Sequence, residues 1–160
     1  MSDFTIKVDD RVAQAALSRL LAFGLDMSPA MADIAEGMMQ HTEDRFDRQQ
    51  SPDGQPWAAL SPAYAQLKQR KQPGLGILVL TGRLSGELRS EFGTDFAEVA
   101  TAGLPYVALH QFGGLPGMAP GPAAVPARPF AGFGPEDQEL VEDVVGDHLR
   151  RLTEQRGSGV

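Results

Sequence analysis

Apolar residues recur at three- and four-residue spacing in three stretches of the chain, which is the pattern of a helix with one buried face. The pattern predicts helices over residues 9–23, 28–49 and 134–156. Ser28 is expected as the N-cap of the second helix, with Pro29 in its first turn, an arrangement that favours helix initiation. The third helix has acidic residues in its first turn and arginines in its last, which suits the helix dipole.

Polar and apolar residues alternate twice between these helices, as they do in strands with one buried face. Residues 87–92 and 96–101 carry the alternation, and Gly93-Thr94-Asp95 between them suits a tight turn. The sequence therefore predicts an antiparallel hairpin. Four shorter elements are also expected: a helix that begins at Ser61-Pro62 and ends before Pro73, a short helix at 81–84 that leads into the hairpin, a helical or extended piece at 106–112, and a strand at 128–133.

These elements together predict one α+β domain spanning residues 1–160. Its expected parts are helices over 1–50, a central region over 51–133 with the small antiparallel sheet, and the closing helix over 134–156. A chain of this length buries about 70% of its unfolded surface without metals or disulfides. No apolar run reaches the roughly 18–20 residues that a membrane-spanning helix requires, so we expect a soluble protein made in a cytoplasm.

The segment that departs most from ordinary domain composition is uncharged and rich in glycine and proline. No residue from 99 to 127 carries a formal charge, and residues 113–127, here called the arm, consist of four Gly, four Pro, four Ala, one Leu, one Met and one Val. Proline lacks an amide donor and glycine adds chain entropy, so this composition excludes core helix and central strand. An uncharged loop of about fifteen residues is also unlike an ordinary water-facing loop. The arm is therefore predicted to lie on another surface.

Aromatic residues stand on both sides of the arm. Tyr106 and Phe112 bound the segment before it, and Pro126-Ala-Arg-Pro-Phe130 follows. These residues are expected to fix the two ends of the arm to a packed domain. The combination points toward assembly rather than catalysis.

The formal net charge of −7 is unevenly distributed. Residues 61–92 hold five basic and two acidic residues, whereas the regions before and after them are acidic. Binding to duplex DNA relies on many lysine and arginine contacts to phosphate. An acidic protein with one small basic region is therefore a poor candidate for coating DNA or reading its sequence, although an acidic face that lines a DNA channel fits this composition.

Residue types that usually carry catalysis or hold cofactors are sparse. The chain has no cysteine, and its three histidines, His41, His110 and His148, lack the spacing of metal ligands. Neither Gly74-Leu-Gly76 nor Gly113-Gly114 is accompanied by the lysine and serine or threonine of a phosphate-binding loop. The sequence predicts no metal site, no cofactor and no enzymatic activity.

Two alternative functions stay open at this point. His110 is interpreted as a packed or interface histidine, but it is also the candidate general base of a small hydrolase if a carboxylate lies beside it. Trp57 follows a dense turn and is interpreted as a core plug for the helix that follows, rather than as a platform for a base or sugar. The candidates for a nucleic-acid-binding module, or for contacts with an acidic patch on a neighbouring subunit, are Lys68, Arg70 and Lys71, with Arg83 and Arg89.

Six short motifs follow one another along the central part of the chain. They are Phe46-x-x-Gln49, Pro-Asp-Gly-Gln-Pro-Trp57, Leu60-Ser-Pro-x-Tyr64, Leu78-Val-Leu-Thr-Gly-Arg-Leu84, Pro105-Tyr-Val-Ala-Leu-His-Gln-Phe-Gly-Gly114 and Pro126-Ala-Arg-Pro-Phe130. In this order they resemble the phage virion morphogenesis family of Mu-like phages, a group related to the tail completion proteins of contractile-tailed phages. The resemblance covers about residues 46–133, with a likeness in the helices on either side.

The resemblance implies a non-enzymatic virion protein that acts late in tail or neck assembly, with no catalytic residues to carry over. Proteins of this broad group, which includes tail terminators and head-tail connectors, form rings, often six-fold, around the channel through which DNA leaves. The expected partners are other copies of this chain in a hexameric ring and neighbouring tail or neck proteins, with DNA passing through the channel without specific binding. The expected location is the virion, after assembly in the host cytoplasm, and an acidic helix face is expected to line or rim the channel.

An uncharged arm between aromatic anchors can exclude water at a subunit contact without burying charge, which the core of a stable interface requires. Seven residues are therefore predicted at or just beneath a subunit boundary. Two of them lie on the arm itself. They are Tyr106, Phe112, Leu115, Met118, Arg128, Pro129 and Phe130.

Overall fold

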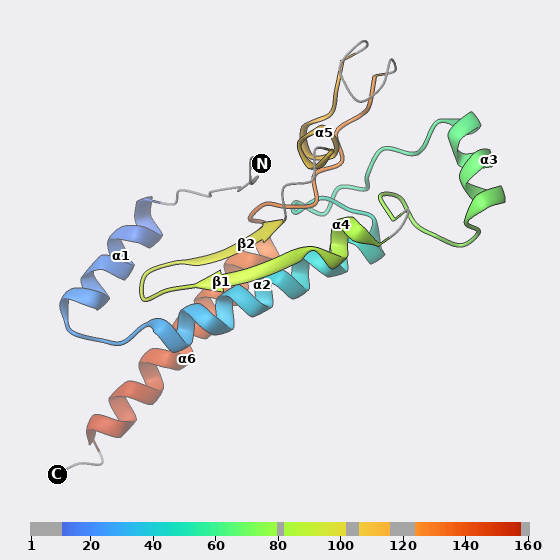
Figure 1. Cartoon of the computed structure of the whole chain (residues 1–160). Coiled ribbons are helices and arrows are strands. Elements are labelled where there is room, and N and C mark those ends of the chain that lie inside the picture. Colours follow the sequence, from blue (N-terminus) through green and yellow to red (C-terminus); the bar gives the residue numbers. More distant parts are fainter. Residues whose placement is uncertain (1–10, 80–81, 102–105, 116–123, 158–160) are drawn as a thin grey trace.

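The computed structural model describes residues 11–79, 82–101, 106–115 and 124–157 (Figure 1). These residues form an α+β fold with six helices and one two-stranded antiparallel sheet. The helices and the hairpin expected from the sequence are confirmed, with ends close to the expected ones. The elements are α1 (Arg11–Ala22), α2 (Ser28–Arg48), α3 (Pro62–Lys71), α4 (Arg83–Gly86), β1 (Leu88–Phe92), β2 (Ala97–Thr101), α5 (Val107–Phe112) and α6 (Pro135–Gly157).

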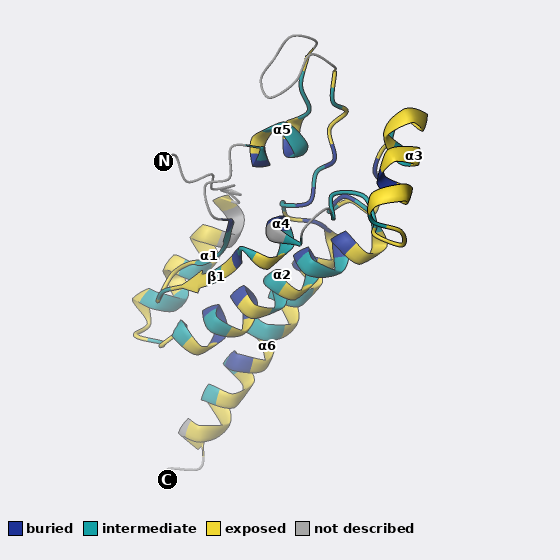
Figure 2. Ribbon diagram, turned by 45° about the vertical axis from the view of Figure 1, so that its right-hand side comes forward, coloured by how far each residue is buried: buried dark blue, intermediate teal, exposed yellow. Residues whose placement is uncertain are grey.

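Helix α2 is the central element, because it packs against both the long α6 helix and the hairpin (Figure 1). Its apolar face is buried along its length (Figure 2), and Ile34, Ala35 and Phe46 lie on that face. Gly37 lies where α2 meets α6, and a Cβ at this position would press against the end of the Leu140 side chain. The glycine therefore lets Leu140 pack directly on the backbone of α2.

The start of α2 differs from the expected cap. Met27, and not Ser28, occupies the N-cap position, and no side chain caps it. The amide of Ser28 donates to Oδ1 of Asp26 at 3.0 Å, and this hydrogen bond lowers the pKa of Asp26. The prediction for Ser28 was wrong because the acid two residues upstream binds the free amide while Met27 is buried in the core. At α3 the helix begins as expected after Ser61, which is the N-cap, and the hydroxyl of Ser61 accepts from the amide of Tyr64 at 3.4 Å.

The hairpin packs on α2 at one end and is open to solvent at the other. The strands pair from Leu88 opposite Thr101 outward to Phe92. The amide of Gly93 donates to the carbonyl of Phe96 at 2.9 Å and closes the turn. Leu88 is buried, whereas Phe92 and Phe96 are about half exposed, so the apolar contribution of the hairpin is concentrated at its inner end.

The main core cluster is aromatic. Phe46 of α2 lies between Trp57 and Phe130, with ring centroids 5.6 Å and 5.3 Å away respectively. Tilted and edge-on pairs at such distances stabilise a fold beyond the burial of their area. The remaining buried members of the cluster are Leu84, Leu88 and Val107.

Trp57 is buried, as its position after the turn predicts, but it packs on the preceding helix. Its ring meets Phe46 of α2 edge-on, and its Nε1 donates to the carbonyl of Pro129 at 2.7 Å. Among the described residues, none from α3 belongs to the core cluster. The expectation that Trp57 plugs the following helix was wrong, because the indole bonds a segment more than seventy residues away.

Residues 128–133, expected as a strand, pair with no strand in the described part of the chain. Side chains hydrogen-bond their backbone instead. The carbonyls of Phe130 and Gly132 accept from Nη1 of Arg45 at 3.2 Å and 2.9 Å. Of the two aromatic residues in this segment, Phe130 is buried and Phe133 is exposed. No neighbouring strand is needed, because a buried guanidinium satisfies carbonyls as well as a strand does.

Arg45 and Asp137 form a buried ion pair between α2 and the start of α6. Nη2 of Arg45 lies 2.5 Å from Oδ2 of Asp137, and the two side chains are 3% and 1% exposed. The same carboxylate oxygen accepts from the amide of Gly134 at 2.8 Å, and Oδ1 lies 2.9 Å from Nδ1 of His41. Both charges are therefore paired and hydrogen-bonded, which their burial requires.

Helix α3 stands apart from this core, and most of its residues are exposed (Figure 2). Tyr64 and Leu67, on its apolar side, are 44% and 46% exposed. Lys68 holds the helix to the turn that follows it, because its Nζ donates to the carbonyl of Gly76.

Replacing Arg45 by methionine is expected to destabilise the fold by about 3–5 kcal/mol, because the carboxylate of Asp137 stays buried without its cation. Arg48→Met is the matched control, since Arg48 lies one turn further along α2 and its ion pair with Glu136 is half exposed. Loss of that pair is expected to cost at most about 1 kcal/mol. Urea denaturation followed by circular dichroism measures both, and equal losses would contradict the role assigned to the buried pair.

Candidate subunit interface

The arm leaves and rejoins the body at one point. The amide of Gly114 donates to the carbonyl of Val125 at 2.8 Å, and the amide of Val125 donates back at 2.9 Å. The described root of the arm rises from α5 and away from α2 and α6 (Figure 1). Residues 116–123, which include Met118, lie outside the described residues.

Gly113 makes this closure possible. Its φ of 78° lies in the left-handed region that glycine adopts readily. A Cβ at this position would lie 2.8 Å from the carbonyl oxygen of Val125 and 2.9 Å from the amide nitrogen of Ala127. Both distances are too short for a side chain, so α5 can end and the two halves of the arm can meet only with glycine here.

Gln111 of α5 ties the chain after the arm to the helix before it. Its buried Oε1 accepts from the amides of Phe130 and Ala131 at 3.1 Å and 3.2 Å, and its Nε2 donates to the carbonyl of Ala131 at 2.7 Å. The carbonyl of His110 accepts from the amide of Arg128 at 2.7 Å. These hydrogen bonds hold the two ends of the arm together without using any residue of its tip.

Arg128 fastens the end of the arm to the 51–60 region. Its side chain is buried, with Nε donating to the carbonyl of Ala58 at 2.7 Å and Nη2 to the carbonyl of Ala59 at 3.0 Å. Desolvation lowers the pKa of Arg128, but a guanidinium stays protonated even when it is buried in a protein. No carboxylate among the described residues pairs with it, so backbone carbonyls hold this buried cation.

The seven residues predicted at a subunit boundary fall into an exposed group and a supporting group. Phe112 and Leu115 are 65% and 71% exposed at the root of the arm. They line one shallow pocket with Gly114 and Val125, and a contiguous apolar patch is typical of a surface that another protein covers. Their contact with a second subunit stays a prediction. The supporting residues are Arg128 and Phe130, which are buried, and Tyr106 and Pro129, which are partly buried, while Met118 lies outside the described residues.

Sequence reasoning missed two side chains that build the base of the arm, Gln111 and Arg45. Gln111 lies among apolar residues in α5, and Arg45 lies beside Phe46 on the buried face of α2. A polar side chain on a buried helix face must find hydrogen-bond partners inside the protein. A polar residue at an apolar position of a helix was therefore the available sign of a buried hydrogen bond. It does not identify the groups that Gln111 and Arg45 bind.

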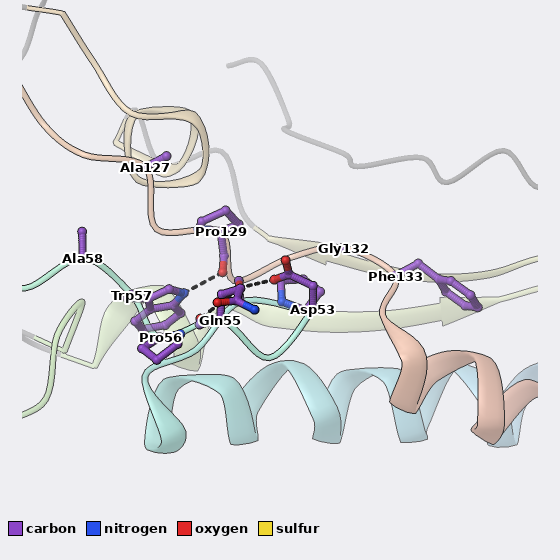
Figure 3. Close-up of a pocket in the computed structure, with 11 residues that line it drawn as sticks. Asp53, Gln55, Pro56, Trp57, Ala58, Ala127, Pro129, Gly132 and Phe133 are labelled. Carbon is purple, nitrogen blue, oxygen red and sulfur yellow. Dashed lines mark hydrogen bonds between the residues drawn. The ribbon is translucent and has the colours of Figure 1, made fainter.

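A groove of about 590 Å³ lies beside the base of the arm, between residues 51–58 and 127–133 (Figure 3). Asp53 is the ionisable side chain among its lining residues, and the hydroxyl of Ser51 donates to it and lowers its pKa. The rest of the lining is mainly rings and small residues. The rings belong to Pro52, Pro56, Trp57, Pro129 and Phe133.

The surroundings of His110 do not support the hydrolase alternative. Its ring lies edge-on to Tyr106 with centroids 6.0 Å apart, and its buried Nδ1 has no hydrogen-bond partner among the described residues. Desolvation, and secondarily the charge of Arg128, lowers the pKa of His110. A general base needs an orienting partner, and the structure gives this imidazole the environment of a packed histidine.

The basic residues of the middle region do not gather into one patch. Lys68 is buried, and desolvation lowers the pKa of its amine. Arg70 and Lys71 are exposed on α3, and Arg89 is exposed on β1. The side chain of Arg83 lies outside the described residues. Exposed cations on two separate elements do not make the continuous phosphate-binding surface that nucleic acid requires.

The described residues contain no group of three or more histidine, aspartate or glutamate side chains that could hold a metal ion. No described helix is both long enough and apolar enough to span a bilayer. The features that distinguish this region are therefore an apolar root, a closed arm and a groove lined by rings.

Comparison with known families decides what kind of protein carries this arm. The Phage virion morphogenesis family matches residues 8–150 of the chain. The chain belongs to this family. The match includes the base of the arm and most of α6, so the resemblance carried by six short motifs extends over most of the fold.

Individual relatives agree with this assignment. The chain is 35% identical over 146 residues to "Putative capsid assembly protein G" of Escherichia phage Mu, covering 89% of this chain and 92% of that protein. It is 33% identical over 138 residues to Mu-like prophage FluMu G protein 2 of Haemophilus influenzae, covering 86% and 89% respectively. No solved structure matches. The chain is thus a phage virion morphogenesis protein homologous to the Mu G protein, in a structural or assembly family not known for enzymatic activity.

Gln111→Leu is expected to lower the free energy of unfolding by about 2–5 kcal/mol, because it leaves the amides of Phe130 and Ala131 without their acceptor. Gln66→Leu on the exposed face of α3 is the matched control and is expected to change stability by about 0.5 kcal/mol or less. Chemical denaturation monitored by tryptophan fluorescence measures both variants. If the two behave alike, Gln111 does not tie the arm to the core.

His110 is expected to make the stability of the protein depend on pH. Its folded-state pKa is below the usual 6.5, so the unfolded chain binds the proton more readily and stability falls as the pH falls below about 6.5. The contribution is fully present above that pH. Urea denaturation at pH 7.5 and at pH 5.5 should show a smaller loss in His110→Gln than in the wild type, whereas the same loss in both would refute the assignment.

Proposed function

We propose that this family member forms a ring, expected to be a hexamer, around a DNA channel and acts in tail completion or head-tail joining. Family membership supports the general class, a virion morphogenesis protein. The name of the Mu relative refers to capsid assembly for that protein, so the tail or neck placement is the finer part of the proposal. A tail-terminator-like or neck-protein-like fold belongs to the same proposal.

The observation that carries the proposal is the construction of the arm. Buried side chains fix both of its ends, while Phe112 and Leu115 stay exposed at its root. Phe112 and Leu115 line one shallow pocket together with residues of the Gly114–Val125 bridge, and apolar side chains gathered in this way form a surface that another protein can cover. In a ring the same contact is repeated at each boundary, so a modest interface per subunit is sufficient for assembly.

The proposed subunit boundary uses the seven residues predicted from the sequence. Phe112, Leu115 and Met118 contribute contacts, whereas the buried and partly buried members keep the base of the arm in place. Neighbouring tail or neck proteins are the proposed partners at the two ends of the ring. Assembly takes place in the host cytoplasm, and the finished protein resides in the tail or neck of the virion.

The acidic face of α6 is proposed to line or rim the channel. Glu139, Glu142, Asp143 and Asp147 are exposed on this helix. Like charges on the wall and on the DNA backbone repel each other, so DNA would pass without being held. An electropositive channel in a structure of the ring would count against this part of the proposal.

Replacing residues 115–124 by an Asn-Gly dipeptide is expected to leave a folded monomer that no longer forms rings. Gly114 and Val125 stay paired in this variant, because Asn-Gly suits the two-residue turn of a hairpin. Phe23→Ala is the control, since Phe23 is exposed and directly follows α1, a helix that lies away from the root of the arm (Figure 1). Light scattering after gel filtration and negative-stain imaging measure assembly, and rings of wild-type size in the shortened variant would overturn the proposal.

A further inference from the structure

We infer that the groove between residues 51–58 and 127–133 receives the arm of a second copy of this chain. This inference rests on the proposed ring and adds to it the surface on which each arm docks. It is carried by the chemistry of the groove, by the chemistry of the arm, and by the direction in which the arm leaves its own subunit.

The groove presents rings rather than charges. Pro52, Pro56 and Pro129 line it with Trp57 and Phe133, and the indole of Trp57 is fixed by its hydrogen bond to the carbonyl of Pro129 (Figure 3). Proline-rich segments bind grooves of this kind, because their backbone is already stiff and loses little entropy on binding. The volume of about 590 Å³ is in the range of sites that enclose a small ligand or a few residues of peptide.

The arm has the composition that such a groove accepts. Residues 115–122 read Leu-Pro-Gly-Met-Ala-Pro-Gly-Pro, with three prolines and no charge. A buried charge without a partner is the main cost of a dry interface. This sequence has no charge, so burying it avoids that cost. The carboxylate of Asp53 is exposed and already accepts a hydrogen bond from Ser51, so docking does not have to bury it.

The position of the groove favours a second copy over the same chain. Ala127, the last residue of the arm, lies at one end of the groove and Phe133 at the other (Figure 3). Beyond Ala127 the arm leads to the Gly114–Val125 bridge and away from its own body (Figure 1). Each half of the arm between these bridging residues can reach at most about 17 Å when extended. A root that points away from its own groove favours docking of the arm in the groove of the next subunit in a head-to-tail ring.

Engineered cysteines test this contact cleanly, because the chain has none of its own. Met118→Cys on the arm is co-expressed, under a different affinity tag, with either Ala58→Cys or Phe133→Cys in the groove. After oxidation, a disulfide between the two tagged subunits can form only between different copies, and it requires Cα atoms within about 7 Å. Met118→Cys paired with Glu142→Cys on the exposed face of α6 is the matched control.

The inference predicts cross-linked pairs of the two tags with at least one groove position, and none with the α6 control. Wild-type-sized rings in which neither groove position cross-links would overturn the inference and leave the ring proposal intact. A disulfide found only within one chain, in the variant carrying both Met118→Cys and Ala58→Cys, would show that the arm closes on its own groove and would also overturn it. Protein that stays monomeric at every concentration and never cross-links would reject the ring, and the docking surface with it.

Discussion

The buried pair between Arg45 and Asp137 sets the geometry on which the rest of the fold depends. One guanidinium binds a carboxylate at the start of α6 and two carbonyls of the segment before it, so α2, α6 and residues 130–132 meet around a single charge. Apolar side chains in the same place would give comparable stability. They would not bind those carbonyls, and Phe130 would then lack the buried polar partner that directs its backbone into the core.

That constraint extends to the surface that we propose for assembly. Phe130 is fixed from one side by Arg45 and from the other by Gln111, and Gln111 lies at the end of α5, where the arm begins. The two ends of the arm are therefore held by the core. Packing within the subunit does not require the glycine- and proline-rich sequence of the arm, so that sequence can suit a contact with another subunit. A rigid base and an uncharged arm are what a repeated, water-excluding subunit contact requires.

The regular spacing of apolar residues predicted the helices and strands in which buried residues recur at regular intervals. Helices α2 and α6 each pack one face against the rest of the fold, and the hairpin alternates polar and apolar residues, so the spacing of their apolar residues can be recognised in the sequence. The strand expected at 128–133 was wrong because its backbone is bonded by the side chains of Gln111 and Arg45, and contacts between distant single residues leave no periodic signal. Flanking aromatics indicated the base of the arm only in part, because Phe130 is buried as expected, whereas Phe112 is 65% exposed and the neighbouring Gln111 ties the segment to the core. The groove was not predictable, because it exists only where residues 51–58 and 127–133 come together.

We propose that the arm, held at its base, binds a neighbouring copy of the chain. A cryo-electron-microscopy map of the assembled protein would decide whether it does. Continuous density is expected from the Gly114–Val125 bridge of one subunit across the boundary to the ring-lined groove of the next. Arms folded over their own subunits, or extending from the ring without touching a neighbour, would contradict it.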